Sequence, residues 1–344
     1  MFAQDAVNTL YIGGGTPSVL PLDVLSRIVG AVSQTERLSL VTEQLSLVTE
    51  PVEVTTPTEL FDEFTVEVNP EDIVEKGREY VRGLLALGVN RISMGIQSFN
   101  DDILRWMNRR HDAGNAVKAF HILRESGVRN ISIDLIFGIS QLTDETWKDT
   151  IEKALELSPE HISAYQLSIE EGSALAKMVA DGRYVEASEE QCRRQYDILC
   201  RCLGRSGYHH YEISNFAKPG FEAVHNSAYW CRAPYIGLGP GAHSLTGNVR
   251  SWNSQELPHR SPDGSSATYS RTSETLSPED IRVERIMLSL RTDKGLKATE
   301  LYSLTDSTVV DALLSEGALE RQGASIRIPE SRLFTSDEIL RELI

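Results

Sequence analysis

Short runs of β-forming residues alternate with longer segments of helical periodicity along the first two thirds of this chain. The predicted strands are residues 9–12, 63–68, 91–97, 131–137, 161–168 and 208–213. The predicted helices are residues 22–32, 70–87, 101–107, 113–126, 144–157 and 188–206. Strands separated by helix-length segments are typical of parallel βαβ units. Six such units favour an α/β fold, a partial parallel (β/α)6 barrel of TIM type, over a short Rossmann half.

The composition changes after residue 247, where the predicted barrel of residues 1–247 ends. Residues 248–277 are polar and rich in Ser and Pro, which predicts a linker or long loop. Residues 278–344 are expected to form a small C-terminal domain. Within it, Pro278–Arg291 and Ala298–Glu316 have helical periodicity, and 326–328 with 333–335 are expected to pair as a two-stranded wing.

The charge balance excludes several classes of protein. The chain carries 50 Asp and Glu against 34 Lys and Arg, a formal net charge of −16. Phosphate contacts need a basic face, so this balance argues against a general binder of nucleic acid or of anionic membranes. The sequence has neither a run of 18 apolar residues nor a secretory leader, and its four cysteines are too few for a disulfide scaffold. We therefore expect a cytoplasmic protein.

An acidic segment of the chain contains a tandem repeat. Residues 38–43 have the sequence LSLVTE, and residues 45–50 repeat it. A single tandem copy does not make a solenoid, which needs several repeats to bury a core. Residues 36–60 are therefore expected to be an inserted surface loop or hairpin, and an acidic docking segment is the alternative.

Polar residues or glycines stand at or near the carboxyl end of each of the first five predicted strands. In parallel α/β sheets this edge forms the ligand site. The first strand ends in Gly13-Gly14-Gly15-Thr16, where the missing Cβ atoms let the backbone approach a ligand closely. The loop has neither the GK[ST] of a P-loop nor a GxGxxG spacing, and a plain strand-to-helix turn is the alternative. Asp134, inside an apolar strand, is either a ligand contact or a satisfied core group.

Eight segments, in order along the chain, resemble motifs of the radical S-adenosylmethionine (radical SAM) proteins related to oxygen-independent coproporphyrinogen III oxidase. They are IGGGTPS (12–18), VEVNPE (66–71), GVNRISMGIQSFND (88–101), NRRH (108–111), ISIDLIFGI (131–139), GYHHYEISNFAKPG (207–220), HNSAYW (225–230) and GLGPGAHS (237–244). The HNxxYW and GLGPGAHS elements favour the heme chaperone (HemW) branch of that family. The resemblance covers nearly the whole chain.

The resemblance implies a set of residues that contact S-adenosylmethionine. The matching positions are Gly14, Gly15, Thr16, Glu67, Gln97, Arg109, Asp134 and Ser168. Their chemistry suits this cofactor, since Glu67 and Arg109 would pair with the ammonium and the carboxylate of its methionine moiety. Asp134 would accept a ribose hydroxyl.

The chain departs from the family pattern at the iron–sulfur site. The family has a CxxxCxxC loop after the first strand, whose three thiolates hold a [4Fe–4S] cluster. Here no cysteine precedes Cys192, so no metal ligands are predicted. Cys200 and Cys202 stand two residues apart in a helical pattern and are expected to pack rather than to bind metal. The chain resembles the family without its first βα unit; a mis-assigned start, a true truncation or a fragment would each produce this.

The resemblance also implies a heme site in the HNxxYW segment. His225 would ligate the iron, and Asn226, Tyr229 and Trp230 would complete the site, because aromatic faces pack on a porphyrin. Packing of a surface histidine is the alternative. Two weaker candidates are the cluster at residues 209–212 and His243.

Three hypotheses of function follow from these motifs. The first is a heme chaperone that binds heme and transfers it to respiratory proteins, including partners at the membrane surface. The second is an enzyme of porphyrin biosynthesis that decarboxylates coproporphyrinogen III by radical SAM chemistry, which requires the cluster. The third is a truncated, non-functional paralogue.

Overall fold

The computed structural model describes residues 7–32, 61–256, 259–260, 267–268 and 270–344. It divides into two compact units, which are described separately. Unit 1 comprises residues 1–210 and 214–225, and unit 2 comprises residues 211–213 and 226–344. The predicted insertion at 36–60 lies outside the described residues.

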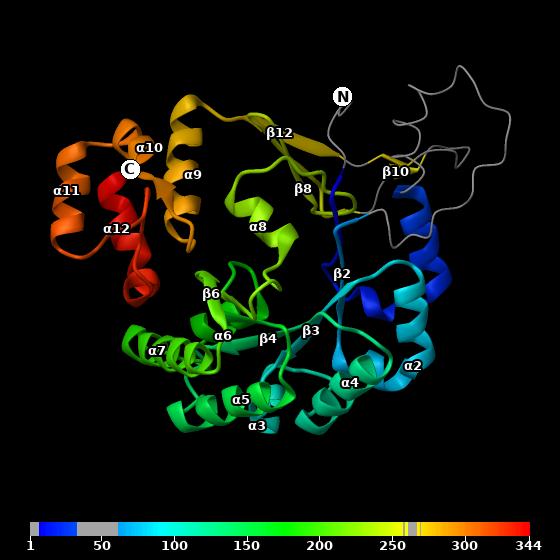
Figure 1. The fold of residues 1–344 in the computed structure, drawn as a ribbon. Coiled ribbons are helices and arrows are strands. Elements are labelled where there is room, and N and C mark those ends of the chain that lie inside the picture. Colours follow the sequence, from blue (N-terminus) through cyan, green and yellow to red (C-terminus); the bar gives the residue numbers. More distant parts are fainter. Residues whose placement is uncertain (1–6, 33–60, 257–258, 261–266, 269) are drawn as a thin grey trace, which may run out of the picture. The chain divides into compact units, whose positions relative to one another are not determined.

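A seven-stranded sheet forms the framework of unit 1, in the order β1-β2-β3-β4-β5-β7-β6 (Figure 1). Strands β1 (Thr9–Ile12), β2 (Glu63–Val68), β3 (Arg91–Gln97), β4 (Ile131–Phe137) and β5 (His161–Gln166) run parallel. The sixth predicted strand, 208–213, is observed as β6 (His209–Glu212). A strand that was not predicted, β7 (Asn215–Ala217), lies between β5 and β6 and runs antiparallel to β5. A two-residue connection is too short for a parallel crossover, so this edge of the sheet is antiparallel.

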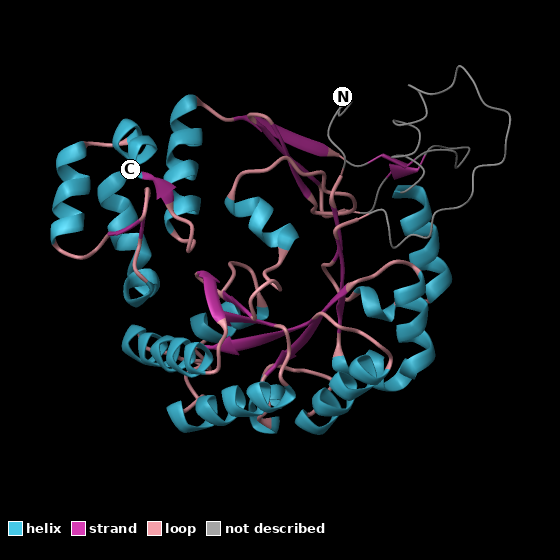
Figure 2. Ribbon diagram, viewed as in Figure 1, coloured by secondary structure: helices cyan, strands magenta, loops and turns pink. Residues whose placement is uncertain are grey.

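Helices cover the outer face of the curved sheet in unit 1 (Figure 2). They are α2 (Pro70–Ala86), α3 (Asp101–Trp106), α4 (Ala113–Glu125), α5 (Asp144–Leu157) and α7 (Glu189–Arg205); residues 22–32 are also helical, and η1 (Pro17–Val19) and α6 (Ala174–Ala180) are short. Side chains of Asn100, Asp112, Thr143 and Ser188 accept hydrogen bonds from the first turns of α3, α4, α5 and α7. These caps explain where the helices begin.

The two faces of the sheet differ in polarity because side chains alternate along each strand. Ile92, Met94 and Ile96 on β3 are fully buried. The alternate positions carry Ser93 on β3, Glu67 on β2 and Asp134 on β4. The parallel half-barrel thus has an apolar face that packs on helices and a polar face that gathers the candidate site residues.

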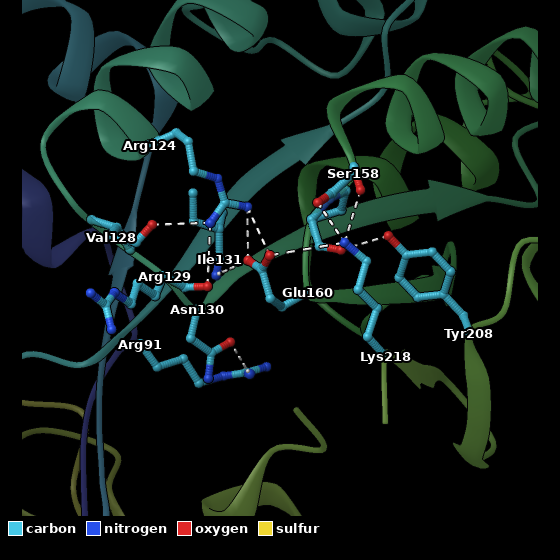
Figure 3. A network of polar contacts seen from close by, with 11 residues as sticks. Arg91, Arg124, Val128, Arg129, Asn130, Ile131, Ser158, Glu160, Tyr208 and Lys218 are labelled. Atoms are coloured by element: carbon cyan, nitrogen blue, oxygen red, sulfur yellow. Dashed lines mark hydrogen bonds and ion pairs between the residues drawn. The ribbon is translucent and has the colours of Figure 1, made fainter. Parts of the chain in front are cut away.

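A polar network ties the amino ends of the strands together (Figure 3). Arg124 donates to both carboxylate oxygens of Glu160, at 2.9 and 2.8 Å, and Glu160 also accepts from the backbone N–H of Ile131 at 3.0 Å. Lys218 donates to the carbonyl and hydroxyl oxygens of Ser158, at 2.9 and 2.8 Å. This network lies at the edge opposite the candidate site and is structural.

Unit 2 contains a three-stranded antiparallel sheet in the order β12-β9-β8, formed by β8 (His243–Thr246), β9 (Val249–Asn253) and β12 (Arg271–Thr275). Strands β10 (His259–Arg260) and β11 (Ala267–Thr268) form a separate pair. The composition of 248–277 predicts a linker, but residues 249–253 and 271–275 within it form strands. Their register pairs every residue of β12 with one of β9, so cross-strand pairing orders a segment that local composition marks as a loop.

The C-terminal part of unit 2 is helical with a small sheet. Its helices are α9 (Pro278–Leu290), α10 (Ala298–Leu304), α11 (Ser307–Ser315) and α12 (Ser336–Leu343), and its sheet has the order β13 (Leu296–Lys297), β15 (Ser325–Arg327), β14 (Glu320–Gln322). The predicted wing strand at 333–335 is wrong, because these residues belong to the 3-10 helix η3 (Glu330–Thr335). β15 instead pairs with 320–322 across the turn at Gly323, whose φ of 60° suits glycine.

Among the described residues, no helix combines the length and the apolar character that crossing a membrane would require.

Candidate functional site

The glycine-rich loop after β1 leaves open space beside its backbone. Gly14 and Gly15 have φ angles of 77° and 72°, and nothing lies within 4 Å of where their Cβ atoms would stand. A Cβ on Gly13 would lie only 2.7 Å from the Glu67 carboxylate. Thr16 has a φ of 130°, a strained value for a β-branched residue, and its hydroxyl accepts a hydrogen bond from the Asn69 amide at 3.1 Å. The loop is therefore held in a shape that glycines permit and Asn69 supports.

Glu67, on the polar face of β2, fixes this loop. Its carboxylate accepts from the backbone N–H of Gly14 at 2.9 Å and from the hydroxyl of Tyr11 at 2.6 Å. Burial and the Glu67 charge hold the pKa of Tyr11 well above its usual range, so the phenol stays protonated and donates. The structure thus brings together Gly14 and Glu67, which are 53 residues apart in sequence.

Asp134 lies on the same face of the sheet, on β4. Burial and the nearby Glu67 carboxylate raise the pKa of Asp134 to about 6, while hydrogen bonds from Ser163 and Ser93 and the charge of Arg91 oppose that rise. The Ser93 hydroxyl donates at 3.3 Å. Two carboxylates within electrostatic reach of each other make this face attractive to a cation.

Arg109 brings a positive charge toward this face. Burial lowers the pKa of Arg109, and the charges of Glu71 and Asp134 oppose that fall. Its guanidinium has no hydrogen-bonding side-chain or backbone partner among the described residues. The next two residues anchor the segment, since Arg110 forms ion pairs with Glu71 and Asp72, at 2.7 and 3.2 Å, and buried His111 contacts Glu71.

Gln97 lies near the residues around the glycine-rich loop, whereas Ser168 has no contact that links it to them among the described residues. Gln97 ends β3 at an irregularity in the register with β4 and has a φ of 69°. Its side chain folds over Gly95, where a Cβ would lie 2.8 Å from the Gln97 amide nitrogen and 3.6 Å from Asn69. Ser168 is exposed after β5, and its hydroxyl donates a 3.0 Å hydrogen bond to the Glu170 carboxylate. The geometry therefore gathers Gln97 near the loop and gives no such link for Ser168.

His225 stands in the first turn of α8 (Val224–Trp230). Its Nδ1 is 2.7 Å from the Thr9 hydroxyl, and its ring stacks on Tyr11 with centroids 5.2 Å apart. The buried Glu63 carboxylate accepts from the backbone N–H groups of Val224 and His225, at 2.9 and 3.0 Å. Burial lowers the pKa of His225, against the opposing charge of Glu63, so the neutral imidazole is favoured. Neutral imidazole is the form that ligates metals.

The other residues of the HNxxYW segment belong to unit 2. The Asn226 amide lies 3.4 Å from the Glu212 carboxylate. Tyr229 is 40% exposed, and its ring packs edge-on against Tyr235 with centroids 4.8 Å apart. Trp230 is partly exposed at the end of α8. Both rings of this segment thus remain at least partly exposed.

The weaker histidine candidates have packing partners. His210 stacks on Phe216 with centroids 4.0 Å apart, and His209 lies 3.3 Å from Glu222. His243 stacks on Trp252. These contacts account for the histidines as parts of the fold.

Sequence reasoning missed three residues of this site. Tyr11 joins the glycine-rich loop to His225, Thr9 contacts the imidazole, and Glu63 caps α8. The one local signal is the alternation of Thr9 and Tyr11 on β1, which puts both side chains on the polar face. Glu63 gave no local signal, because its partners are more than 160 residues away.

The cysteines lie apart from the glycine-rich loop in sequence. Cys192, Cys200 and Cys202 are on α7, and exposed Cys231 follows α8. Burial raises the pKa of Cys192, which disfavours its thiolate. Cys200 and Cys202 are two residues apart on a helix and face different directions.

Comparison with known proteins agrees with this architecture. Residues 1–154 match the family model of the radical SAM superfamily. The solved structure of coproporphyrinogen III oxidase (HemN) from Escherichia coli superposes with a TM-score of 0.74 at 21% identity, covering 99% of this chain and 78% of that one. This likeness confirms the expected α/β half-barrel fold.

Sequence relatives identify the branch. The chain is 34% identical over 296 residues to heme chaperone HemW of Lactococcus lactis, covering 86% of this chain and 72% of the relative. It is 33% identical over 295 residues to heme chaperone HemW of Bacillus subtilis, covering 85% and 72%. This chain therefore belongs to the HemW family of heme chaperones, within the radical SAM superfamily.

Proposed function

We propose that this protein binds heme through α8, with His225 as an axial ligand of the iron, and passes the heme to respiratory proteins. The observation that carries the proposal is the way His225 is held. Thr9 engages Nδ1, Tyr11 stacks on the ring, and Glu63 anchors the first turn of the helix. A second partner on one ring nitrogen is the usual arrangement of metal-ligating histidines, because it fixes the tautomer and the ring orientation.

Titration with hemin, followed by the Soret band, tests the proposal. The wild-type chain is expected to shift the Soret band of hemin with saturable binding, and His225→Ala to abolish the shift that axial ligation produces. His121→Ala is the matched control, because His121 is an exposed histidine on α4. A wild-type chain with no Soret shift, or equal shifts in all three proteins, would contradict the proposal. Transfer of the bound heme to an apo-cytochrome tests the second half.

We also propose that the glycine-rich edge of unit 1 binds S-adenosylmethionine. The open space where Cβ atoms of Gly14 and Gly15 would stand would let the methionine end of this cofactor approach the backbone closely. The carboxylates of Glu67 and Asp134 suit its ammonium and its ribose hydroxyls, and Arg109 suits its carboxylate. Gln97 and Thr16 are proposed as further contacts of the cofactor. Ser168 is proposed as a contact only because it matches a cofactor-contacting position of the family. Isothermal titration with S-adenosylmethionine measures this binding directly.

The residues present do not fit a [4Fe–4S] cluster. Such a cluster needs three convergent thiolates, and this sequence has its four cysteines on α7 and after α8. We therefore derive no step through a cluster, and we do not propose coproporphyrinogen decarboxylation for this chain. The glycine-rich edge of unit 1 would hold S-adenosylmethionine through the carboxylates of Glu67 and Asp134 and the guanidinium of Arg109.

A further inference from the structure

Two arginines of unit 2 converge on one carboxylate. Arg232 donates from Nε to the Glu284 carboxylate at 2.7 Å, and Arg250 donates to the other oxygen of the same group. The three side chains are largely removed from solvent, with exposed fractions of 13% for Arg232, 21% for Glu284 and 34% for Arg250. Glu274, which also contacts Arg250 at 3.2 Å, is nearly half exposed. The cluster thus holds two arginines and two carboxylates, of which Glu284 is the more buried.

The Arg232 guanidinium is only partly satisfied. Its Nη2 atom is buried and has no hydrogen-bond acceptor among the described residues. A buried donor without an acceptor is costly, and more so when it carries charge. This unpaired donor can take one more acceptor, and a charged donor forms its strongest hydrogen bonds with an anionic acceptor.

The backbone at Arg232 is strained as well. Its φ of 55° is left-handed, a conformation that glycine or asparagine adopts at lower cost. Its N–H donates to the Tyr229 carbonyl at 3.0 Å, so the strained residue sits directly after α8. A glycine would form this turn with less strain. What an arginine contributes here beyond a glycine is its side chain, whose charged end is the guanidinium.

The cluster adjoins the aromatic residues of α8. Tyr235 pairs with Leu245, and Leu245 pairs with Arg250 across the antiparallel ladder, so Tyr235 and Arg250 project to the same face of the sheet. Tyr235 in turn packs edge-on against Tyr229. Unit 2 therefore has an aromatic surface and an incompletely paired guanidinium side by side.

The segment that follows Tyr235 also exposes two apolar side chains. Beyond Tyr229, Ile236 is 48% exposed and Leu238 is 73% exposed on the chain that leaves Tyr235. A ligand that matches an apolar aromatic surface bordered by cationic donors is a flat hydrophobic molecule with carboxylate substituents. A porphyrin with two propionates has this chemistry.

We propose that Arg232, supported by Arg250, binds a propionate of heme, the ligand of the proposed function, where the porphyrin packs on Tyr229 and Tyr235 of unit 2. This inference rests on that function and adds to it a recognition element for the carboxylates of the porphyrin. Arg232 would direct its Nη2 to the propionate while Nε stays on Glu284. Arg250 would continue to share Glu284 with Arg232.

Esterified hemin separates this inference from heme binding itself. The full chain is titrated with hemin and with hemin dimethyl ester, in which methyl esters replace both propionate carboxylates, under identical detergent conditions. The wild type is expected to bind hemin about tenfold more tightly than the ester, the size of one lost charged hydrogen bond. Arg232→Gln and Arg232→Gly are expected to lose this preference by weakening hemin alone, and Arg250→Gln to reduce it.

Two further variants guard against misfolding. Arg232→Gly suits the left-handed backbone, so a normal melting temperature for this variant excludes a folding defect as the cause. Arg285→Gln is the control, because Arg285 pairs with Glu300 at 2.8 Å in the same unit and its exposure of 37% is close to the 34% of Arg250. It is expected to keep the full preference.

The outcomes distinguish the two claims. A wild type that binds hemin and its ester equally would overturn the propionate assignment and leave heme binding intact. Retention of the preference in both Arg232 variants would overturn it as well. A wild type that binds neither compound would overturn the proposed function and this inference together.

Discussion

The imidazole of His225 stacks on the phenol ring of Tyr11, with centroids 5.2 Å apart and an interplanar angle of 21°. The same phenol donates its hydroxyl to Glu67, which accepts from the backbone of Gly14. One aromatic residue therefore touches both the histidine of the proposed heme site and the carboxylate of the proposed S-adenosylmethionine site.

Removing only the Tyr11 hydroxyl should separate these two roles. Tyr11→Phe keeps the ring against His225 and deprives Glu67 of one donor, which loosens the glycine-rich loop. We expect the affinity for S-adenosylmethionine to fall about 3- to 10-fold, measured by calorimetry, while the hemin Soret titration stays unchanged. A parallel loss of hemin binding would show that the hydroxyl matters for both sites.

Hemin binding should persist into mildly acidic solution. Burial lowers the pKa of His225, against the Glu63 charge, so the imidazole remains neutral below the ordinary histidine pKa of about 6.5. On lowering the pH from 8 to 5, we expect the ligation-dependent Soret band to reach half its amplitude below pH ~6.5. Half-loss above that value would contradict this account. Because the folded pKa is depressed, protonation favours the unfolded chain as the pH falls through the same range.

The ionised carboxylate of Asp134 should lower the free energy of unfolding in neutral solution. Its folded pKa of about 6 lies above the value of 3.8 for an unperturbed group, so the folded state binds more protons and stability falls as the pH rises from about 4 to 6. Asp134→Asn is expected to stabilise the protein by about 1 kcal/mol at pH 8. Thermal melts at several pH values check this: the difference should shrink toward pH 4, and a constant difference would refute the assignment.

The network at the amino ends of the strands should contribute stability without affecting ligand binding. Glu160→Gln weakens the paired bonds to Arg124 and is expected to cost about 1–3 kcal/mol of unfolding free energy. Glu125→Gln is the control, because the Arg78–Glu125 pair is more than half exposed and should contribute under ~1 kcal/mol. Urea denaturation measures both, and altered hemin affinity in folded Glu160→Gln would contradict a purely structural role.

The isolated chain should bind S-adenosylmethionine without cleaving it reductively. Radical cleavage requires a cluster held by three thiolates, and the cysteines on α7 and after α8 do not supply them. With dithionite present, we expect chromatography to detect no 5′-deoxyadenosine above the protein-free blank. Formation of this product in proportion to protein would overturn that expectation.

Much of unit 1 followed from local patterns in the sequence. The alternation of strands and helices predicted the half-barrel, because period-2 and period-3.6 patterns are set by neighbouring residues. The same alternation put Glu67 and Asp134 on one face of the sheet. Strand β7 was not predicted and the wing strand at 333–335 was predicted wrongly, since short segments carry little periodicity and their pairing depends on partners elsewhere in the chain.

The sequence by itself thus determined the order of strands and helices along the chain, the polar face of the sheet and the positions of the family motifs. Only the tertiary structure decided that Glu63 caps α8, that Thr9 meets His225 across 216 residues, and that Arg232 and Arg250 share Glu284. Contacts between distant residues depend on strand register and on the path of the connecting segments. No short stretch of sequence specifies these, because the free energy that fixes them comes from packing the whole unit.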